Sequence, residues 1–504
     1  MALKIGISGL RGTIIGGEPG LTPDVALRWA RAFATTVQGK AGRGASIALG
    51  RDGRRSSPTL ADLVRAALQA SGARVVDLGL TLTPTVQYAV ATNPGLAGGV
   101  MITASHNPVV WNGLKFLDAE GRFLPLERWA EMEAIIAEER FRTVALDQLV
   151  PVEAAGEAAW QAHQAAILAA LPVEAIRARR LRLAFDACNS GAVRWQSLFA
   201  TLGCETIPLH TELTGFFARE AEPLPQHLGA LAHLVCAAGC DLGLAADPDG
   251  DRLVLVDEHG QAVSEEHTVV LCARERLAAG AGDTVVVNVV TTHAIDEAFL
   301  EAEIWRTAVG EMNVVNGLLD AYRPALGGEG SGGIIVPGVN LARDGGAAAG
   351  LILSLLATTG RPLSTLVAEI PPWSSVKSKL TITSGDLEAA RALLTAWQVR
   401  PPLVRFEGCS TVLWAGGDTG QLRLRLTGSH LHLELGLEDG RTLAAEGDGR
   451  DLAPIFASLP ETAGPEHMSF LDGLKVWGPQ SWLSLRPSNT EPILRVMGEM
   501  RDSR

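Results

Sequence analysis

The chain has 504 residues, which is too long for one hydrophobic core, so we expect about three or four domains. Hydrophobic residues make up 47% of it and charged residues 20%, as in ordinary globular proteins. A net charge of −13 without any basic run argues against a nucleic-acid partner. Residues 1–12 lack the apolar run of a signal peptide, and the longest apolar stretch, Ala347–Ala357, is too short to span a membrane. Together with six scattered cysteines, expected to be buried and reduced, these features predict a cytoplasmic protein without a membrane partner.

Strands and helices alternate through residues 1–150. Thr22 and Pro23 are residue types that begin a helix, which we expect to run to about Val37. The other elements expected here are strands at 46–49 and 75–78 and helices at 59–70 and 127–139. Strands separated by crossover helices indicate a parallel or mixed sheet.

A polar segment follows the β-forming run Val100–Ile102, and Pro108 prevents that run from continuing as a central strand. Ser105 and His106 are therefore expected on a loop at the carboxyl end of a strand, where open α/β sheets bind ligands. Ser105 is a possible nucleophile, His106 a neighbouring donor or base, and Lys115 a cation able to return to the loop. Taken alone, such a segment is more often a polar turn between strands.

The later part of the chain repeats this alternation. Further strands are expected at 182–186, 241–246, 253–256, 284–290 and 334–336, with a weakly patterned, alanine-rich bridge at 152–170 and a turn at 307–311. Asp344 is placed to cap an alanine- and leucine-rich helix. Pro371 and Pro372 mark a boundary, after which alternating stretches at 422–426 and 431–437 indicate a smaller α+β domain.

Three aspartates alternate in the segment Asp247-Pro-Asp-Gly-Asp-Arg252. Carboxylates at this density repel one another unless a cation neutralises them, and oxygen-only ligation suits Mg²⁺. A calcium-binding EF-hand is excluded because Arg252 stands where that loop needs glycine and a strand follows it. A solvated acidic turn is the simpler alternative.

Two further segments carry polar residues on loops. The glycine-rich segment 327–333 has Glu329 and Ser331 as its polar residues and lacks the Gly-Lys-Ser/Thr ending of a nucleotide-binding loop, so by itself it predicts a flexible loop. The segment from 486 to 495 combines guanidinium, hydroxyl and amide donors, a set that suits a phosphate dianion. Its candidate residues are Arg486, Ser488, Asn489, Thr490 and Arg495.

Four stretches in this order, 99–116, 247–252, 327–333 and 486–492, resemble the α-D-phosphohexomutase family of phosphoglucomutases, phosphomannomutases and phosphoglucosamine mutases. The resemblance runs from Gly6 to Arg495. It implies three similar α/β domains with mixed sheets followed by a smaller α+β domain, with the active site in a central cleft. The boundaries we expect are 1–150, 151–262, 263–371 and 372–504.

The resemblance also implies roles for particular residues. Ser105 would carry a phosphoryl group and complete a metal site made with Asp247, Asp249 and Asp251. The remaining residues that would act on the phosphoryl group are Arg11, His106, Lys115 and Arg252, and those that would bind substrate are Asn107, Glu311, Glu329, Ser331 and the set in 486–495. Two features depart from the family pattern. Glu311 stands where members carry His or Asp, so the identity of the acid/base stays open. Gly332 and Gly333 stand where many members carry His or Phe, so the sugar preference stays open as well.

The expected activity is a Mg²⁺-dependent exchange between hexose 1-phosphate and hexose 6-phosphate through phosphorylated Ser105, with hexose 1,6-bisphosphate as intermediate and activator. Substrates would be small hexose phosphates of glucose, mannose or glucosamine, and the protein a monomer or homodimer. The alternatives are a sugar-phosphate phosphatase, against which the 486–495 segment argues, and a non-catalytic sugar-phosphate binding protein. A serine hydrolase is disfavoured because Ser105 lacks the Gly-x-Ser-x-Gly motif.

Overall fold

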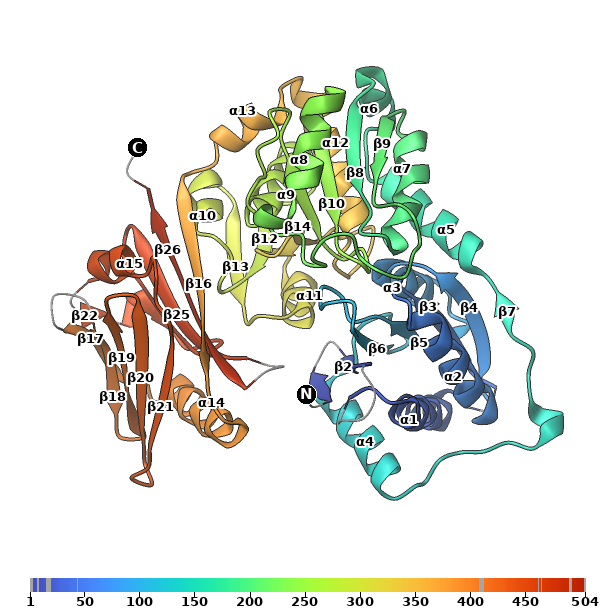
Figure 1. Cartoon of the computed structure of the whole chain (residues 1–504), viewed down its shortest axis with the longest axis horizontal. Helices are drawn as coiled ribbons and strands as arrows, with labels where there is room; N and C mark the ends of the chain where they lie inside the picture. The colour runs from blue at the N-terminus through green and yellow to red at the C-terminus, as the bar shows by residue number, and fades with distance from the viewer. Residues whose placement is uncertain are drawn as a thin grey trace. The chain divides into compact units, whose positions relative to one another are not determined.

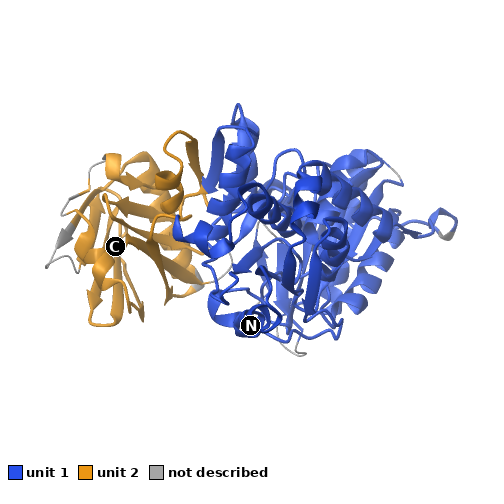
Figure 2. Ribbon diagram, turned by 90° about the horizontal axis from the view of Figure 1, so that it is seen from above, with its two compact units in different colours: residues 1–287, 310–369 blue, residues 288–309, 370–504 orange. Residues whose placement is uncertain are grey.

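The computed structural model describes residues 3–6, 9–14, 20–42, 44–407, 412–460, 462–463, 465–488 and 492–502. The chain forms two compact units, which Figure 2 shows in different colours. Unit 1 contains residues 1–287 and 310–369, and unit 2 contains residues 288–309 and 370–504. Among the described residues, no helix combines the length and the apolar character needed to cross a bilayer.

The first part of unit 1 is built on a mixed sheet. Its strands are β1 (Lys4–Gly6), β2 (Gly9–Thr13), β3 (Ser46–Arg51), β4 (Arg74–Leu80), β5 (Leu96–Ile102), β6 (Trp111–Leu117) and β7 (Glu153–Ala154). Its helices are α1 (Pro23–Ala41), α2 (Ser57–Ala70), α3 (Thr83–Thr92), α4 (Leu126–Ala137) and α5 (Gly156–Ala169). Strand β3 is parallel to β4 and β5, whereas β6 is antiparallel to β5 and β2 (Figure 1).

Helices bury both faces of this sheet. On one face, the side chains of α1, α2 and α4 form a cluster with the strands in which Phe33 and Trp129 both contact Phe116. On the other face, α3 contributes Val86 and Val90 to a separate cluster. Burial on both faces explains the continuous apolar runs of β3 and β5 in the sequence.

Two further α/β layers complete unit 1. The second has strands β8 (Arg182–Asp186), β9 (Glu205–Leu209), β10 (Leu242–Ala246) and β11 (Leu253–Val256), and helices α6 (Val173–Arg179), α7 (Trp195–Thr201) and α8 (Gly229–Ala238). The third has strands β12 (Thr284–Asn288), β14 (Pro324–Glu329) and β15 (Gly333–Ile335), and helices α9 (His267–Ala278), α11 (Glu311–Asp320), α12 (Gly345–Thr359) and α13 (Leu363–Ala368). In each layer a parallel pair is extended by an antiparallel neighbour, β11 beside β10 and β15 beside β14.

Unit 2 is dominated by an antiparallel sheet. The elements of this unit are α10 (Ala294–Ala298), β13 (Glu303–Thr307), β16 (Trp373–Thr381), α14 (Ser384–Val399), β17 (Leu403–Glu407), β18 (Val412–Gly417), β19 (Gly420–Thr427), β20 (His430–Leu437), β21 (Thr442–Asp448), α15 (Ala453–Ser458), β22 (Thr462–Ala463), β23 (Met468–Ser469), β24 (Leu474–Trp477), β25 (Ser481–Pro487) and β26 (Ile493–Arg501). Among its described residues the strand order is β22-β17-β18-β19-β20-β21-β16-β26-β25-β24-β23. Trp397 of α14 and Phe456 of α15 lie in the core that covers one face of this sheet.

The expected architecture, three α/β layers with mixed sheets followed by a smaller α+β region, is confirmed. The alanine-rich segment 152–170 contains the regular helix α5, because alanine favours helix and Trp160, His163 and Ile167 recur on one buried face. A local expectation for the glycine-rich segment was wrong. The glycines at 327 and 328 lie in strand β14 rather than in a flexible loop. A side chain at Gly327 would collide with Leu318 of α11, so these glycines allow helices to pack closely on the strand.

A buried polar chain ties α3 and α5 to α12. The His163 ring lies between two partners, with Nδ1 3.0 Å from Thr85 Oγ1 and Nε2 2.7 Å from Asp344 Oδ2. The other carboxylate oxygen of Asp344 accepts hydrogen bonds from the backbone N–H groups of Gly346 and Ala347, as the sequence predicted for a helix cap. One carboxylate therefore caps a helix and holds two other helices to it.

We predict that Asp344→Ala destabilises the protein by about 2–4 kcal/mol, because it removes a double helix cap and leaves the buried His163 without an acceptor. Thr22→Ala is a matched control, since Thr22 caps α1 through a single bond to Val25 and its loss should cost about 1 kcal/mol. Urea denaturation of both variants measures the difference. Equal destabilisation by the two substitutions would show that the His163 contact contributes nothing.

Candidate active site

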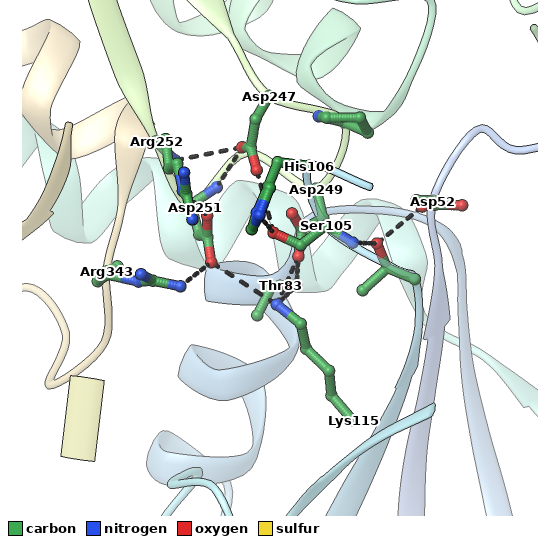
Figure 3. Close-up of polar contacts among 12 residues, drawn as sticks. Asp52, Thr83, Ser105, His106, Lys115, Asp247, Asp249, Asp251, Arg252 and Arg343 are labelled. Atoms are coloured by element: carbon green, nitrogen blue, oxygen red, sulfur yellow. Dashed lines mark hydrogen bonds and ion pairs between the residues drawn. The ribbon is translucent and has the colours of Figure 1, made fainter. Parts of the chain in front are cut away.

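The loop that follows β5 meets the loop between β10 and β11 inside unit 1. Ser105 Oγ lies 3.4 Å from Asp247 Oδ2, and Lys115 on β6 places its Nζ 2.7 Å from Asp249 Oδ2 (Figure 3). Ser105 and Lys115 are each only 1% exposed, and the aspartates at 247, 249 and 251 are fully buried. Segments separated by more than a hundred residues thus form one buried polar cluster.

The backbone at Ser105 has a φ of 51°, a left-handed conformation that a non-glycine residue adopts only when its surroundings hold it there. Part of that support is a hydrogen bond of 2.8 Å from the Ser105 N–H to Thr103 Oγ1. The Thr103 hydroxyl in turn donates to Asp52 Oδ2 at 2.7 Å. The conformation directs the Ser105 side chain toward the aspartate loop (Figure 3).

Arg54 supports the same loop from the side of β3. Its guanidinium is completely buried, forms an ion pair of 3.0 Å with Asp52 and lies 4.9 Å from the ring of Phe217. It also donates to backbone carbonyl oxygens of Ser105, Asn107, Pro108 and Trp111 at 2.6–3.0 Å. One side chain therefore sets the course of the whole loop.

The three aspartates form a group that could hold a metal ion, since one oxygen of each lies within 4.8 Å of the others. Asp249 Oδ1 and Asp251 Oδ1 are buried and accept no hydrogen bond from any described donor. Each of their second oxygens is engaged, by Lys115 and Thr83 for Asp249 and by Arg343 for Asp251. Buried carboxylate oxygens without donors are ready-made ligands for a hard cation, so the residues present fit a divalent ion.

The charges of the cluster are unevenly stabilised. Burial and repulsion from Asp251 and Asp249 raise the pKa of Asp247 well above its usual value. Burial acts in the same direction on Asp249, but the charge of Lys115 and the hydrogen bonds from Lys115 and Thr83 together outweigh it, so the pKa of Asp249 is lowered. Without a bound cation the loop therefore has more negative charge than its neighbours can compensate.

His106 lies next to Ser105. Its ring Nδ1 lies 3.4 Å from Ser105 Oγ, and burial together with the nearby Arg252 and Arg11 lowers the pKa of His106 well below its usual value. The imidazole is placed to donate or accept a hydrogen bond at Ser105. Arg11, which donates to Asn107 Oδ1 at 3.0 Å, and Arg252 add to the positive charge that Lys115 and Arg343 bring to the site.

Glu311, Glu329 and Ser331 lie in the third layer of unit 1. Glu311 begins α11, Glu329 ends β14, and Ser331 occupies the turn between β14 and β15. Both glutamates are buried, and both form ion pairs with Arg343. The Arg343 Nε atom lies 3.1 Å from Glu311 Oε2, and its Nη1 atom lies 2.7 Å from Glu329 Oε2. Burial raises the pKa of Glu311 even though Arg343 opposes that shift.

The predicted phosphate residues of unit 2 lie near the end of its chain. Arg486 on β25 and Arg495 on β26 are direct partners in register, and Arg495 is also paired with Lys379 on β16. Like charges opposite each other destabilise a sheet unless an anion or another acidic group compensates them, and Asp472 pairs with Arg486 at 3.0 Å. Ser488 is buried at the end of β25, whereas Asn489 and Thr490 lie outside the described residues.

Sequence reasoning missed three contributors to the site. Thr83 begins α3 and donates to Asp249 Oδ2 at 2.5 Å, Arg54 frames the Ser105 loop, and Arg343 binds Asp251. The sequence around two of these residues could have indicated their importance. Arg54 lies in a glycine- and arginine-containing stretch after a strand, and Arg343 directly precedes the helix cap Asp344. Thr83 stands next to Pro84 and offers only the pattern of a helix start.

The chain matches known protein families over most of its length. Three family models described as phosphoglucomutase/phosphomannomutase, alpha/beta/alpha domains I, II and III, match residues 2–143, 161–260 and 264–373 respectively. A "Probable phosphoglucosamine mutase" of Methanopyrus kandleri is 37% identical over 503 residues, covering 99% of this chain and 94% of the relative. A "Phosphoglucomutase/phosphomannomutase" of Thermococcus kodakarensis is 29% identical over 506 residues, covering 99% of this chain and 95% of that relative.

The fold is shared with solved structures. A phosphoglucomutase/phosphomannomutase family protein from Burkholderia thailandensis superposes with a TM-score of 0.74 at 23% sequence identity. The match covers 99% of this chain and 93% of that protein. At 23% identity this similarity shows a shared fold only. Membership of the family is shown by the family models and by the relative that is 37% identical.

We predict that the aspartate loop binds Mg²⁺ and that Asp249→Asn weakens this binding at least about 10-fold, because it removes one carboxylate charge from the ligand set. Isothermal calorimetry of the EDTA-treated protein measures it directly. Asp257→Asn is the control, since Asp257 is a nearby buried aspartate that accepts hydrogen bonds from the N–H groups of His259 and Gln261 and should leave Mg²⁺ binding unchanged. Equal affinity in all three proteins would remove the loop as the metal site.

Proposed function

This chain belongs to the α-D-phosphohexomutase family and is therefore an isomerase, and we propose that Ser105 carries the phosphoryl group it moves between O1 and O6 of a hexose. The observation that carries the proposal is the position of Ser105 Oγ, 3.4 Å from Asp247 and beside two aspartate oxygens that lack donors. A phosphoryl group on Ser105 would bring negative charge to a place where Lys115 and the arginines of the site supply positive charge. The substrates are phosphates of glucose, mannose or glucosamine.

Phosphoryl transfer depends on positioning and charge compensation more than on covalent activation. In the first half-reaction the bond from Ser105 Oγ to phosphorus breaks, a hydroxyl oxygen of the hexose phosphate bonds to phosphorus, and the proton of that hydroxyl ends on Ser105 Oγ, which leaves a hexose 1,6-bisphosphate. In the second half-reaction Ser105 Oγ takes the other phosphoryl group, and its proton ends on the sugar oxygen that is released. Arg11, Lys115 and Arg252 compensate the charge on the transferring group, and His106 hydrogen-bonds at Ser105.

The aspartate loop and Ser105 would hold one Mg²⁺ ion, which supplies further charge compensation for the transferring group. Glu329 and Ser331, with Asn107 and Glu311, would bind the sugar. The row of cations formed by Arg486, Arg495 and Lys379 supports a phosphate site in unit 2, completed by Ser488, Asn489 and Thr490. The proposal includes a cytoplasmic monomer or homodimer activated by hexose 1,6-bisphosphate.

Two measurements test the role of Ser105. A coupled assay with glucose, mannose and glucosamine 1-phosphates and a trace of bisphosphate should show turnover of at least one of them. Ser105→Ala should lower that turnover rate by a factor of at least about 1,000. Intact-mass spectrometry should find a phosphorylated fraction that Ser105→Ala removes. Release of inorganic phosphate in place of the isomeric hexose phosphate would favour the phosphatase alternative, and phosphate found only on another residue would refute the assignment.

The phosphate site of unit 2 distinguishes a mutase from a phosphatase. A charge-assisted contact from Arg486 to phosphate contributes roughly 2–4 kcal/mol, so Arg486→Ala should lower kcat/KM for hexose 1-phosphates about 30- to 1,000-fold. Transfer of the Ser105 phosphoryl group to water should change far less, because water carries no second phosphate. The mutant should also need more added bisphosphate, since the intermediate would escape more often.

Arg450→Ala is the control for that substitution. Arg450 also lies in unit 2 and pairs with a carboxylate, Asp448, but its side chain is 75% exposed. Its loss should leave kcat/KM within about twofold, as expected for an exposed ion pair. Unchanged mutase kinetics in Arg486→Ala would show that Arg486 has no part in binding substrate.

A further inference from the structure

Arg343 joins three acidic residues that come from different parts of unit 1, the loop after β10, the start of α11 and the end of β14. Its Nη2 lies 2.6 Å from Asp251 Oδ2, its Nη1 2.7 Å from Glu329 Oε2, and its Nε 3.1 Å from Glu311 Oε2. Its backbone is fixed as well, because it pairs with Ile335 in an isolated bridge and the next residue caps α12. Figure 3 shows its guanidinium directed at Asp251.

The ion pairs of Arg343 are shielded from solvent. Arg343 is 8% exposed, Glu311 6%, Glu329 5% and Asp251 0%. A planar guanidinium can serve three carboxylates because its donors point in fixed, separate directions, which an ammonium group cannot reproduce. In so little water each contact restricts the orientation of its carboxylate strongly.

Gly333 provides the space that Arg343 occupies. A side-chain carbon at Gly333 would lie too close to Arg343 Cδ for any real contact, so the arginine could make room for it only by giving up its present ion pairs. The backbone of Gly333 does not need glycine for its own conformation, since its φ is not in the left-handed region. Gly333 is therefore glycine because of Arg343.

Both carboxylate oxygens of Glu329 are held by contacts within unit 1. Its Oε2 is bound by Arg343 and its Oε1 accepts the backbone N–H of Gly310 at 3.1 Å. These two contacts fix the plane of the carboxylate, and each of its oxygens has two lone pairs. Arg343 thus controls where the acceptor sites of Glu329 point.

We propose that Arg343 is a positioning residue, which holds Glu329 in the orientation that binds the middle hydroxyls of the hexose and anchors it to the metal loop through Asp251. This inference rests on the proposed function, in which Glu329 binds the sugar. Arg343 acts through Glu329, so its loss should abolish recognition of a particular hydroxyl. A merely structural role would instead weaken all ligands equally.

The test compares ligands that differ in one hydroxyl. Dissociation constants of glucose 6-phosphate and its 3-deoxy and 4-deoxy derivatives are measured by calorimetry with Mg²⁺ in the Ser105→Ala background, where no turnover occurs. Glucose, mannose and glucosamine share these two hydroxyls, so the sugar preference does not affect the comparison. A hydrogen bond to a charged carboxylate predicts that one deoxy derivative binds about 10- to 150-fold more weakly than glucose 6-phosphate. We call this difference the affinity ratio, which is the dissociation constant of the deoxy derivative divided by that of glucose 6-phosphate. Both Arg343→Lys and Glu329→Gln should reduce the affinity ratio to below about threefold.

Gly333→Ala provides a second variant that alters no charge. Its methyl group would displace the side chain of Arg343, so the ratio should fall in the same way. Arg274→Lys is the control, since Arg274 binds Glu369 and the Leu366 carbonyl away from this cluster and should keep the full ratio. Melting temperatures measured alongside identify any variant that fails to fold, and the remaining variants decide the outcome.

The outcomes separate the two claims. If Glu329→Gln keeps the full ratio, Glu329 does not bind the hydroxyl, and both the sugar site of the proposed function and the role of Arg343 are overturned. If Glu329→Gln loses the ratio while Arg343→Lys and Gly333→Ala retain it, only the role of Arg343 is overturned. Loss of the ratio in all three variants, with Arg274→Lys unchanged, supports the inference.

Discussion

The burial of three aspartates on one short loop is the constraint on which the rest of unit 1 depends. Two carboxylates about 4 Å apart repel by about 4 kcal/mol at an effective dielectric constant near 20, so such a loop persists only if cations surround it. Lys115 reaches it from β6 and Arg343 from the start of α12, while two carboxylate oxygens receive no donor from the described residues. The protein supplies enough positive charge to fold around the loop and leaves a place for a further cation.

The same loop is joined to the first layer of unit 1 by hydrogen bonds that involve no net charge. The backbone N–H of Thr83 donates to the Asp249 carbonyl at 2.9 Å, in addition to the contact of the Thr83 hydroxyl with the carboxylate. The Ser190 hydroxyl accepts a hydrogen bond from the Gly53 N–H at 2.8 Å and donates one to the Pro248 carbonyl at 2.5 Å. These bonds hold the Ser105 loop and the aspartate loop in fixed positions relative to each other, and reactions that depend on positioning require that precision.

The departures from the family pattern lie together in the third layer. Glu311 and Gly333 both lie beside Arg343, one as its ion-pair partner and the other as the residue that makes room for it. The relatives that match nearly the full chain carry names that differ in the hexose, among them phosphoglucosamine mutase and phosphomannomutase. The family therefore specifies the reaction, whereas the names of the relatives do not specify the hexose.

Much of the site followed from the sequence because its residues stand where strands end. Ser105 follows β5 and Asp247 follows β10, and both ends were recognisable from an apolar run that stops at polar residues and proline. The cap at Asp344 was equally local, since a cap bonds to residues two or three positions away. Sequence alone thus determined the layers, the positions of the Ser105 loop and the aspartate loop at strand ends, and the helix cap.

Only the tertiary structure decided which distant groups meet. Arg54 binds carbonyls more than fifty residues away, and His163 binds Asp344 across 181 positions. The glycines of β14 had the composition of a flexible loop, yet they are glycines because helices pack against them. Local patterns report only the preferences of neighbouring residues, whereas these contacts depend on how separate layers pack. For that physical reason the roles of Arg54, Arg343 and Gly333 became visible only in the folded chain.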